Sequence, residues 1–405
     1  MKVETAEPIR PAAVPAPSIG MLVRLALVMS LGSAIGQGFG RFAYALLLVP
    51  MRNDLGWSYA QAGLMGSANA LGYLAGALLV GPTVARWGAR RTLRLSVLAA
   101  SLSLICAGLT PDFSLLLLCR AVNGLSAGLI FVGGAAIVME LDPANRSSQP
   151  LSIYYAGPGI GIALSGLLVP VALGVLGWAW GPVWIGMGVI GLLVQILIEL
   201  ALRRTASAPA RSGVVAGGSL FVAADYLRLW PGLLSYALFG LGYIGYMTFV
   251  VAFLQSLGVD PLVVQGFWVV VGVAAALTGV TWGPLIQRVA PHVALICLLA
   301  ALSTGALLPV LVPQLWSFVL SGLLFGGSFL GFVSALTRQI RLALPPARWT
   351  TVTGNATALF AAGQLLGPTL TGLIADRQGG LATGLVGSAG VLVLAALVVL
   401  FGPKP

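Results

Sequence analysis

Apolar segments long enough to cross a lipid bilayer follow one another along this chain, from Leu22 to Phe401. A transmembrane helix needs about 20 apolar residues, and the segments have roughly that length. The composition agrees, because 59% of the residues are hydrophobic and only 8% are charged. Soluble proteins carry about a quarter charged residues, and so few charges cannot cover a surface that faces water. The chain is therefore predicted to be an all-α, polytopic membrane protein.

Charge clusters and turn residues divide the chain into twelve predicted helices. Of the 21 basic residues, only Arg52 and Arg377 fall on one face of the predicted membrane, and only Arg41 and Arg120 fall inside helices. The positive-inside rule places the other, basic face and both termini in the cytoplasm of a bacterial inner membrane. The predicted helices are 22–49, 59–83, 92–110, 114–139, 149–174, 180–201, 229–255, 262–286, 292–312, 315–339, 350–375 and 380–401.

The two halves of the chain repeat each other at an offset of 202 residues. Gly38-x-Gly40-x-x-x-Tyr44 returns as Gly240-x-Gly242-x-x-x-Tyr246, and Gly81-Pro82-x-x-x-Arg86 returns as Gly283-Pro284-x-x-x-Arg288. Parallel repeats of this kind are typical of secondary transporters. We therefore expect four parts: a disordered cytoplasmic tail (1–21), an N-terminal six-helix bundle (22–201), a cytoplasmic linker (202–228) and a C-terminal six-helix bundle (229–401).

Three motifs stand out in the first half: Gly81–Arg91 (GPTVARWGARR), Arg120–Gly124 (RAVNG) and Tyr155–Gly161 (YAGPGIG). Together they resemble the helix 2–3 loop, helix 4 and helix 5 signatures of the major facilitator superfamily. Two positions depart from the family pattern, since Ala85 stands where the family normally has Asp and Asn123 where it has Gln.

Two further segments, Gly38–Tyr44 and Tyr59–Gly63, resemble the bacterial YbfB/YjiJ-type branch of this superfamily. The resemblance implies the major facilitator fold, with twelve transmembrane helices in two pseudo-symmetric six-helix halves around a central cavity. It also implies a transporter, and it points to no particular substrate.

Arg41 is the strongest candidate for a substrate-binding residue. A guanidinium near the bilayer centre costs about 2.5–3.5 kcal/mol on insertion scales, so some interaction is expected to offset it. The planar fork of Arg41 suits a carboxylate or phosphate, and we expect it to bind an anionic group of the substrate. The structural alternative is an arginine that extends to the membrane interface or donates to backbone carbonyls.

Arg120 is the second cation inside a predicted helix. The resemblance links this arginine to helix packing and, in antiporters, to proton coupling, and both roles stay open. None of the ten acidic residues falls near the middle of a predicted helix. Two cations without facing carboxylates predict a cavity of positive potential, which favours anions. A coupling proton is still possible, carried by the anion itself or by Asp112 or Asp376 at the outer mouth.

Hydroxyl, amide and ring side chains on several predicted helices are expected to line the cavity and orient a small polar ligand. Tyr44 and Tyr246 are the stronger candidates because they occupy repeat-related positions. For each of these residues the alternative is a bond between helices or an anchor at the interface. The substrate-binding candidates beside Arg41 are Gln37, Tyr44, Asn123, Tyr154, Tyr243, Tyr246 and Asn355, with Asn69, Tyr73, Tyr155 and Gln364 as further lining residues.

The helix 2–3 loop and the end of helix 4 suggest a cytoplasmic gate. Arg86 and Arg90 lie on that loop, and Glu140 ends helix 4, so we expect them to pair when the inner side closes. The alternative is a solvated, positive-inside loop. Gly157 and Pro158 are expected to form a close helix contact and a bend in helix 5, as a moving seam requires.

These features favour a secondary carrier that moves a small organic anion by alternating access. The alternative within the same fold is an exporter of amphipathic or drug-like compounds, for which aromatic lining matters more than Arg41. A membrane enzyme would need paired acids, a metal cluster or a nucleophile with its base, and no such set stands out.

The expected partners follow from the same residues. Three cysteines without paired spacing and a single histidine predict no metal site, and no cofactor is expected. The chain has no Walker-type glycine loop, which argues against direct use of ATP. We expect a small-molecule substrate, the lipid bilayer and a possible coupling proton as partners, no nucleic acid, and a monomer.

Overall fold

The computed structural model describes residues 18–141, 147, 149–203, 222–377 and 380–402, and every regular element in these ranges is a helix. Eleven helical stretches within them are long and apolar enough to cross a membrane. The elements are α1 (Ile19–Ser33), η1 (Ala34–Phe42), α2 (Tyr44–Leu55), α3 (Tyr59–Trp87), α4 (Ala89–Leu109), α5 (Phe113–Leu141), α6 (Gln149–Tyr155), α7 (Gly157–Pro170), η2 (Val171–Val175), α8 (Trp180–Arg203), α9 (Ala223–Ser256), α10 (Pro261–Ala276), α11 (Thr278–Thr281), α12 (Gly283–Arg288), α13 (Pro291–Leu311), α14 (Leu315–Ala343), α15 (Pro346–Ala375) and α16 (Gly380–Phe401).

Most predicted helices match these elements to within a few residues, but the prediction of one continuous helix over 262–286 is wrong. The chain forms α10, which is shorter than a full span, and then the brief helices α11 and α12. Glycines at 279 and 283 weaken the helix here, and Pro284 has no backbone N–H to continue it.

The first transmembrane stretch, Ile19–Leu55, contains a wide helical segment, η1, between α1 and α2. Its widened turns are visible in the backbone bond from the Ala43 N–H to the Gly38 carbonyl, five residues back, at 2.8 Å. Insertions of this type occur often at functional sites and leave some carbonyls free for other donors. Since η1 ends at Phe42, Arg41 is the last residue but one of this wide segment.

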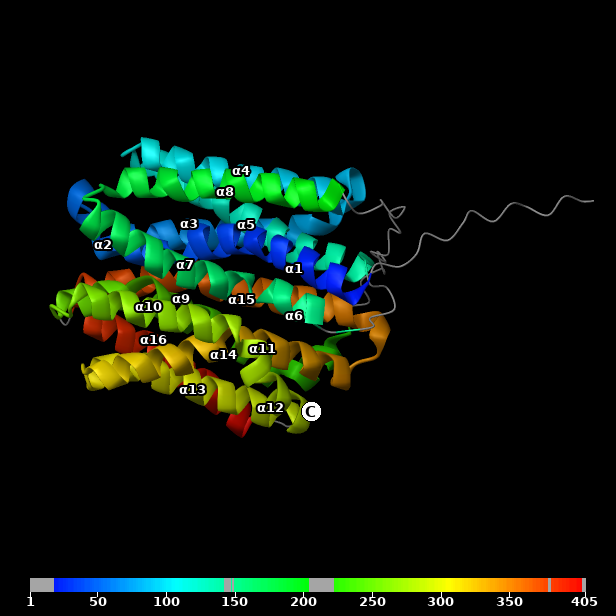
Figure 1. The fold of residues 1–405 in the computed structure, drawn as a ribbon. Coiled ribbons are helices and arrows are strands. Elements are labelled where there is room, and N and C mark those ends of the chain that lie inside the picture. The colour runs from blue at the N-terminus through cyan, green and yellow to red at the C-terminus, as the bar shows by residue number, and fades with distance from the viewer. Residues whose placement is uncertain (1–17, 142–146, 148, 204–221, 378–379, 403–405) are drawn as a thin grey trace, which may run out of the picture.

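We name the helices of Ile19–Arg203 the N set and the helices of Ala223–Phe401 the C set. Within the N set α3 packs on α5 and α4 on α8; within the C set α9 packs on α15 and α16, and α13 on α14. Between the sets, α3 packs on α15, α7 on α10 and α2 on α9. Figure 1 shows the N set, blue to green, above the C set, with all long helices running along a common direction.

The two ends of this bundle differ. The basic end, which carries Arg86, Arg203 and Arg288, is also where α1 begins and α16 finishes (Figure 1). At this end α6 packs against α1, α5 and α7 of its own set, and α11 and α12 pack against α10, α13 and α14 of theirs.

At the opposite end the two sets meet closely. A Cβ on Gly63 of α3 would overlap the Pro368 carbonyl of α15, and a Cβ on Gly372 would overlap the Tyr59 carbonyl. Only glycine allows backbones to approach this closely. The seam of α3 and α15 therefore joins the sets at the opposite end, and a second seam joins α7 to α10, where a Cβ on Gly159 would overlap the Ala276 backbone N.

Candidate functional site

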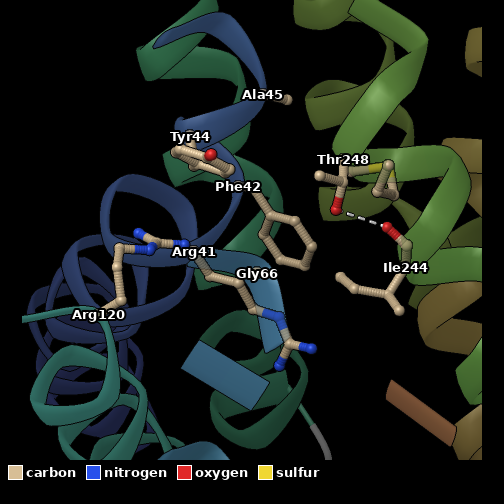
Figure 2. A pocket seen from close by; sticks show the side chains of 9 residues that line it. Arg41, Phe42, Tyr44, Ala45, Gly66, Arg120, Ile244 and Thr248 are labelled. Carbon is tan, nitrogen blue, oxygen red and sulfur yellow. Dashed lines mark hydrogen bonds between the residues drawn. The ribbon is translucent and has the colours of Figure 1, made fainter. Parts of the chain in front are cut away.

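Arg41 is 7% exposed and lies at the end of η1, facing the C set. Its Nη2 atom is buried and has no hydrogen-bond partner. The guanidinium carbon lies 5.1 Å from the centre of the Tyr73 ring and 5.7 Å from the centre of the Phe42 ring. Figure 2 shows the side chain extending away from Tyr44 and Ala45, toward the space beneath Ile244. Arg41 is thus a buried cation with donor capacity to spare.

Arg120 is also buried, at 4% exposed, and two of its guanidinium nitrogens donate to backbone carbonyls. Its Nη1 donates to the Gly40 carbonyl of η1, and its Nε donates to the Met65 carbonyl of α3 at 3.3 Å. The guanidinium also lies 4.8 Å from the centre of the Tyr44 ring. Arg120 therefore ties η1 and α3 to its own helix α5, and it occupies a carbonyl that the wide helix releases.

A small pocket lies between the two sets beside these arginines. Phe42 and Ala45 line it from the N set, and Ile244 and Met247 line it from the C set. A water-sized sphere finds only about 10 Å³ of free space inside, room for about one water. A larger ligand does not fit this pocket without movement of the side chains or helices around it. The residues around the pocket are Arg41, Phe42, Tyr44, Ala45, Gly66, Arg120, Ile244, Met247 and Thr248.

Several polar atoms around this centre lack partners. Asn69 donates to Asn123 Oδ1 at 3.1 Å and to the Arg120 carbonyl at 3.2 Å, which leaves Asn69 Oδ1 and Asn123 Nδ2 buried and unpaired. In the C set, Gln364 Nε2 donates to the Tyr243 hydroxyl at 2.6 Å, and Gln364 Oε1 is unpaired. Most buried polar groups in proteins are bonded, so these unpaired donors and acceptors are candidate contacts for a ligand or for water.

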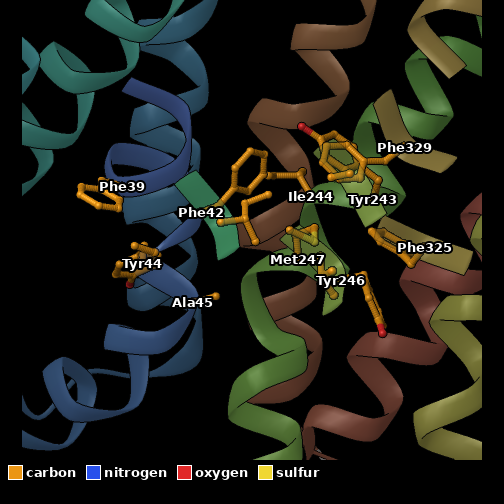
Figure 3. Packing of buried hydrophobic residues seen from close by; sticks show 14 of the residues in the cluster. Phe39, Phe42, Tyr44, Ala45, Tyr243, Ile244, Tyr246, Met247, Phe325 and Phe329 are labelled. Atoms are coloured by element: carbon orange, nitrogen blue, oxygen red, sulfur yellow. The ribbon is translucent and has the colours of Figure 1, made fainter. Parts of the chain in front are cut away.

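The C set presents aromatic rings to the same centre. We call Tyr236, Phe239, Tyr243, Phe329 and Phe360 the ring stack. The ring centres of Tyr236 and Phe360 lie 4.5 Å apart, and their planes differ by 6°. For Phe239 and Tyr243 the ring centres are 4.8 Å apart and the planes differ by 20°. For Tyr243 and Phe329 the ring centres are 6.0 Å apart and the planes differ by 12°. Phe42, which follows Arg41 in the N set, packs in a T-shaped arrangement with Phe329, and their ring centres lie 5.9 Å apart (Figure 3). The stack therefore contacts the segment that carries Arg41.

The structure brings together only part of the predicted cavity set. Gln37, Arg41, Asn123 and Tyr243 are all buried, and the Asn123 amide packs against Gly40, the residue before Arg41. Tyr44 lines the pocket, but its hydroxyl donates to the Ala62 carbonyl at 2.8 Å.

The other three candidates make contacts within a single set. The Tyr154 hydroxyl donates to the Ile130 carbonyl at 2.5 Å, and the Tyr246 hydroxyl pairs with Ser321 at 2.7 Å. Asn355 is exposed and bonds the Tyr226 hydroxyl at 2.5 Å near the start of α9. These contacts join helices of one set. A role for these three residues in substrate binding stays a prediction.

The gate residues lie at the basic end. Arg90 donates to the Leu202 carbonyl at 3.2 Å, and Arg94 pairs with Glu199 of α8 at 3.0 Å, a partner that the sequence did not single out. Arg86 and Glu140 are exposed, and the neighbouring Asp142 lies outside the described residues. A latch between Glu140 and the arginines of the loop therefore stays a prediction.

Gly157 and Pro158 open α7 directly after the break at Ala156, so helix 5 is interrupted where the sequence predicts a bend. A Cβ on Gly157 would overlap the Ser30 carbonyl of α1, which explains the glycine. Both residues contribute to packing inside the N set, close to the seam that α7 forms with α10.

Sequence reasoning missed a contact at the opposite end. Asp376, at the end of α15, accepts hydrogen bonds from the Tyr59 N–H at 2.7 Å and the Ala60 N–H at 2.8 Å, the first turn of α3. A carboxylate at a helix N-terminus satisfies free N–H groups and complements the helix dipole. This cap crosses from the C set to the N set. No local signal in the sequence identifies it, because its two partners lie 317 residues apart.

This arrangement defines a class of protein. Long apolar helices surround a buried, partly unpaired polar centre between the two helix sets. These are features of a multi-pass membrane transporter. Residues 33–400 match the family described as "Uncharacterised MFS-type transporter YbfB", and the chain belongs to that family. It is a transporter of the major facilitator superfamily, not an enzyme.

Related proteins agree with this class. The chain is 27% identical over 383 residues to the 3-(3-hydroxy-phenyl)propionate transporter of Escherichia coli (strain K12), covering 91% of this chain and 88% of that protein. It is 27% identical over 182 residues to the purine ribonucleoside efflux pump NepI of Salmonella typhimurium, covering 42% of this chain and 45% of that protein. The crystal structure of the nucleoside transporter NupG has a TM-score of 0.73 and 15% identity, covering 94% of this chain and 98% of that one, which shows a shared fold.

Proposed function

We propose that this protein is a secondary carrier that moves a small organic anion across the bacterial inner membrane by alternating access. In this proposal α10, α11 and α12 together form the span that completes twelve, and residues 22–201 and 229–401 are the two six-helix bundles. The basic end faces the cytoplasm, as the positive-inside rule requires. The carrier works as a monomer, and a proton is its candidate coupling ion.

The observation that carries this proposal is the unpaired Nη2 of Arg41. A cation buried between the two sets is costly unless an opposite charge or several acceptors satisfy it. Arg120 donates to two backbone carbonyls, whereas Arg41 keeps an unpaired, buried Nη2. The planar fork of a guanidinium suits the two oxygens of a carboxylate. The relative from Escherichia coli supports this choice, because the compound in its name is a carboxylate.

Contacts at the two ends support alternating access. The sets are closed at the opposite end by the glycine seam of α3 and α15 and by the Asp376 cap, while α6, α11 and α12 pack within their own sets at the basic end. This is the arrangement expected of an inward-open carrier. An outward-open state requires these cross-set contacts to break and others to form at the basic end.

The test is binding of carboxylates to the purified protein, with Arg41→Gln beside the wild type. A ligand at 100 times its dissociation constant stabilises a fold by about 2.7 kcal/mol, so a thermal-shift screen of anions, cations and neutral solutes can detect it. We expect carboxylates to stabilise the wild type and to lose this effect in Arg41→Gln. Arg24→Ala removes the same charge from an exposed position and serves as the control.

The second candidate is an exporter of amphipathic compounds, and the ring stack is the observation that favours it. Flat apolar rings bind aromatic ligands of any charge. If lipophilic cations or neutral compounds stabilise the protein, and Arg41→Gln leaves this effect unchanged, the exporter replaces the anion carrier. The efflux pump NepI is related to this chain over less than half of its length, and it supports this candidate only to that extent.

A further inference from the structure

We propose that the site takes an aromatic carboxylate held by both sets at once, with its carboxylate at Arg41 and its ring against Tyr243 and Phe329. This inference rests on the proposed function and narrows its substrate class. It also gives the ring stack a role in substrate binding, which the carrier function alone does not require.

The first argument is the geometry of the rings. Tyr243 lies nearly parallel to three neighbours, with plane angles of 20° to Phe239, 12° to Phe329 and 13° to Phe360. Offset-stacked pairs are stabilising, so each ring holds its neighbour in place. Aligned rings form a flat wall that another planar ring can extend.

The second argument is where the wall meets the charge. Tyr243 and Phe329 are both buried, at 3% exposed each, and Phe329 contacts a ring of the N set. The ring centres of Phe329 and of Phe42, the residue after Arg41, lie 5.9 Å apart with planes at 63°, which brings the segment of Arg41 against the stack. A carboxylate bound at Arg41 therefore places the remainder of the ligand against the outer face of the stack.

The third argument is the pair of polar groups beside the rings, the Tyr243 hydroxyl and the Gln364 amide. The Tyr243 oxygen accepts from Gln364 Nε2, so its own proton can be donated to a ligand, and Gln364 Oε1 is buried without a partner. Together they offer one donor and one acceptor at the rim of the stack. A hydroxyl or amino substituent on the ligand's ring would satisfy both, whereas an unsubstituted ring would leave Gln364 Oε1 unpaired.

The two ends of such a ligand contact different sets. Arg41 belongs to η1 of the N set, and Tyr243 and Phe329 belong to α9 and α14 of the C set. A ligand with both a ring and a carboxylate can therefore draw the sets together, while an aliphatic acid or a neutral aromatic engages one set only. A ligand shifts a conformational equilibrium only by its differential affinity for the two states, so the bifunctional compound is the one expected to drive closure at the basic end.

Paired ligands test this inference on the wild-type protein. Benzoate, phenylacetate and 3-phenylpropionate are each compared by titration calorimetry with the cyclohexyl acid of the same chain length, which keeps the charge and removes the flat ring. An aromatic contact adds to apolar burial by an amount that corresponds to about a 2- to 10-fold tighter dissociation constant. We expect this preference for the phenyl acids in at least one pair.

Two variants locate the effect. Phe329→Leu removes one ring of the stack and keeps an apolar side chain, and we expect the phenyl preference to fall to about one. Phe325→Leu is the matched control, since Phe325 lies one turn earlier on α14, is fully buried and packs at 4.3 Å on Tyr246, outside the stack. The Phe325→Leu variant should keep the wild-type preference for phenyl over cyclohexyl acids.

The outcomes separate the two proposals. Phenyl and cyclohexyl acids that bind equally, with affinity lost in Arg41→Gln, would overturn the aromatic assignment and leave the anion carrier standing. A phenyl preference that survives Phe329→Leu but is lost in Phe325→Leu would also overturn it. If no carboxylate binds in a manner that depends on Arg41, the proposed function itself fails.

Discussion

Two buried arginines with the same chemistry have different surroundings in this protein. Arg120 donates to the carbonyls of Gly40 and Met65, so its charge is stabilised by backbone dipoles of η1 and α3. The Arg41 guanidinium makes cation–π contacts with the rings of Tyr73 and Phe42, and its Nη2 has no hydrogen-bond partner. Side chains that satisfy the fold and side chains that await a ligand therefore differ in their hydrogen bonds, and burial alone does not distinguish them.

This contrast predicts opposite effects of the same substitution. Arg120→Met leaves two buried carbonyls without a donor, at a cost of about 1–3 kcal/mol each, and should lower the apparent melting temperature. Arg41→Met removes an unpaired buried charge and should keep or raise it, while anion binding is lost. Intrinsic tryptophan fluorescence during heating measures both. A melting temperature that falls equally in the two variants would show that Arg41 also holds the fold together.

At the scale of elements, the seam between α3 and α15 depends on small residues and one cap. Gly63 and Gly372 allow the backbones to touch, and Asp376 accepts the two N–H groups that begin α3. Such a contact is easy to break and re-form, because the N–H groups and the exposed carboxylate can each bind water when the sets part. The seam is therefore suited to a gate that opens toward the opposite end.

Asp376→Asn should weaken closure at the opposite end. The neutral amide accepts weaker bonds than a carboxylate and loses the interaction with the helix dipole, which together amounts to about 1 kcal/mol, or roughly fivefold in the closed-to-open ratio. Spin labels at Asn53→Cys in α2 and Gln255→Cys in α9, in a background without the native cysteines, would report a larger share of long distances.

Asp112→Asn is the matched control for this experiment. Asp112 accepts the Leu115 N–H at 2.8 Å at the start of α5, so it caps a helix at the same end of the bundle without crossing between the sets. Its substitution should leave the distance distribution unchanged. An equal shift in both variants would mean that Asp376 acts on helix stability rather than on the gate.

For the whole molecule, charge is distributed by end. Arg86, Arg203 and Arg288 lie exposed at the basic end, whereas Arg52 and Arg377 are the basic residues that the described chain carries at the opposite end. The inner leaflet is anionic and the membrane potential is negative inside, which favours arginine on the cytoplasmic side. The proposed inward-open state and the proposed orientation thus depend on each other.

A labelling experiment tests the orientation directly. In cells that express single-cysteine variants without the native cysteines, a membrane-impermeant maleimide should label Asn53→Cys and should label Arg203→Cys only after the cells are opened. Both positions are exposed, so access to the reagent depends on the side of the membrane alone. The reverse pattern would place the basic end outside and would turn the inward-open assignment into an outward-open one.

Much of this protein was determined by its sequence alone. Membrane insertion, the positions of most helices and the presence of Arg41 and Arg120 within them depend on hydropathy and charge along the chain, which are local properties. The repeat and the motifs Gly81–Arg91 and Tyr155–Gly161 were sufficient to indicate the superfamily to which the chain belongs. Local composition also explains, once seen, the break after α10, where two glycines and Pro284 interrupt the helix.

Only the tertiary structure decided which polar groups meet. The cap of Asp376 on α3 joins residues 317 apart, the bond of Arg120 to Gly40 joins residues 80 apart, and the bond of Gln364 to Tyr243 joins residues 121 apart. The sequence therefore names the available donors and rings but cannot tell which remain unpaired. That depends on helix rotation and on the wide turn of η1, which follow from packing between distant segments rather than from any local propensity.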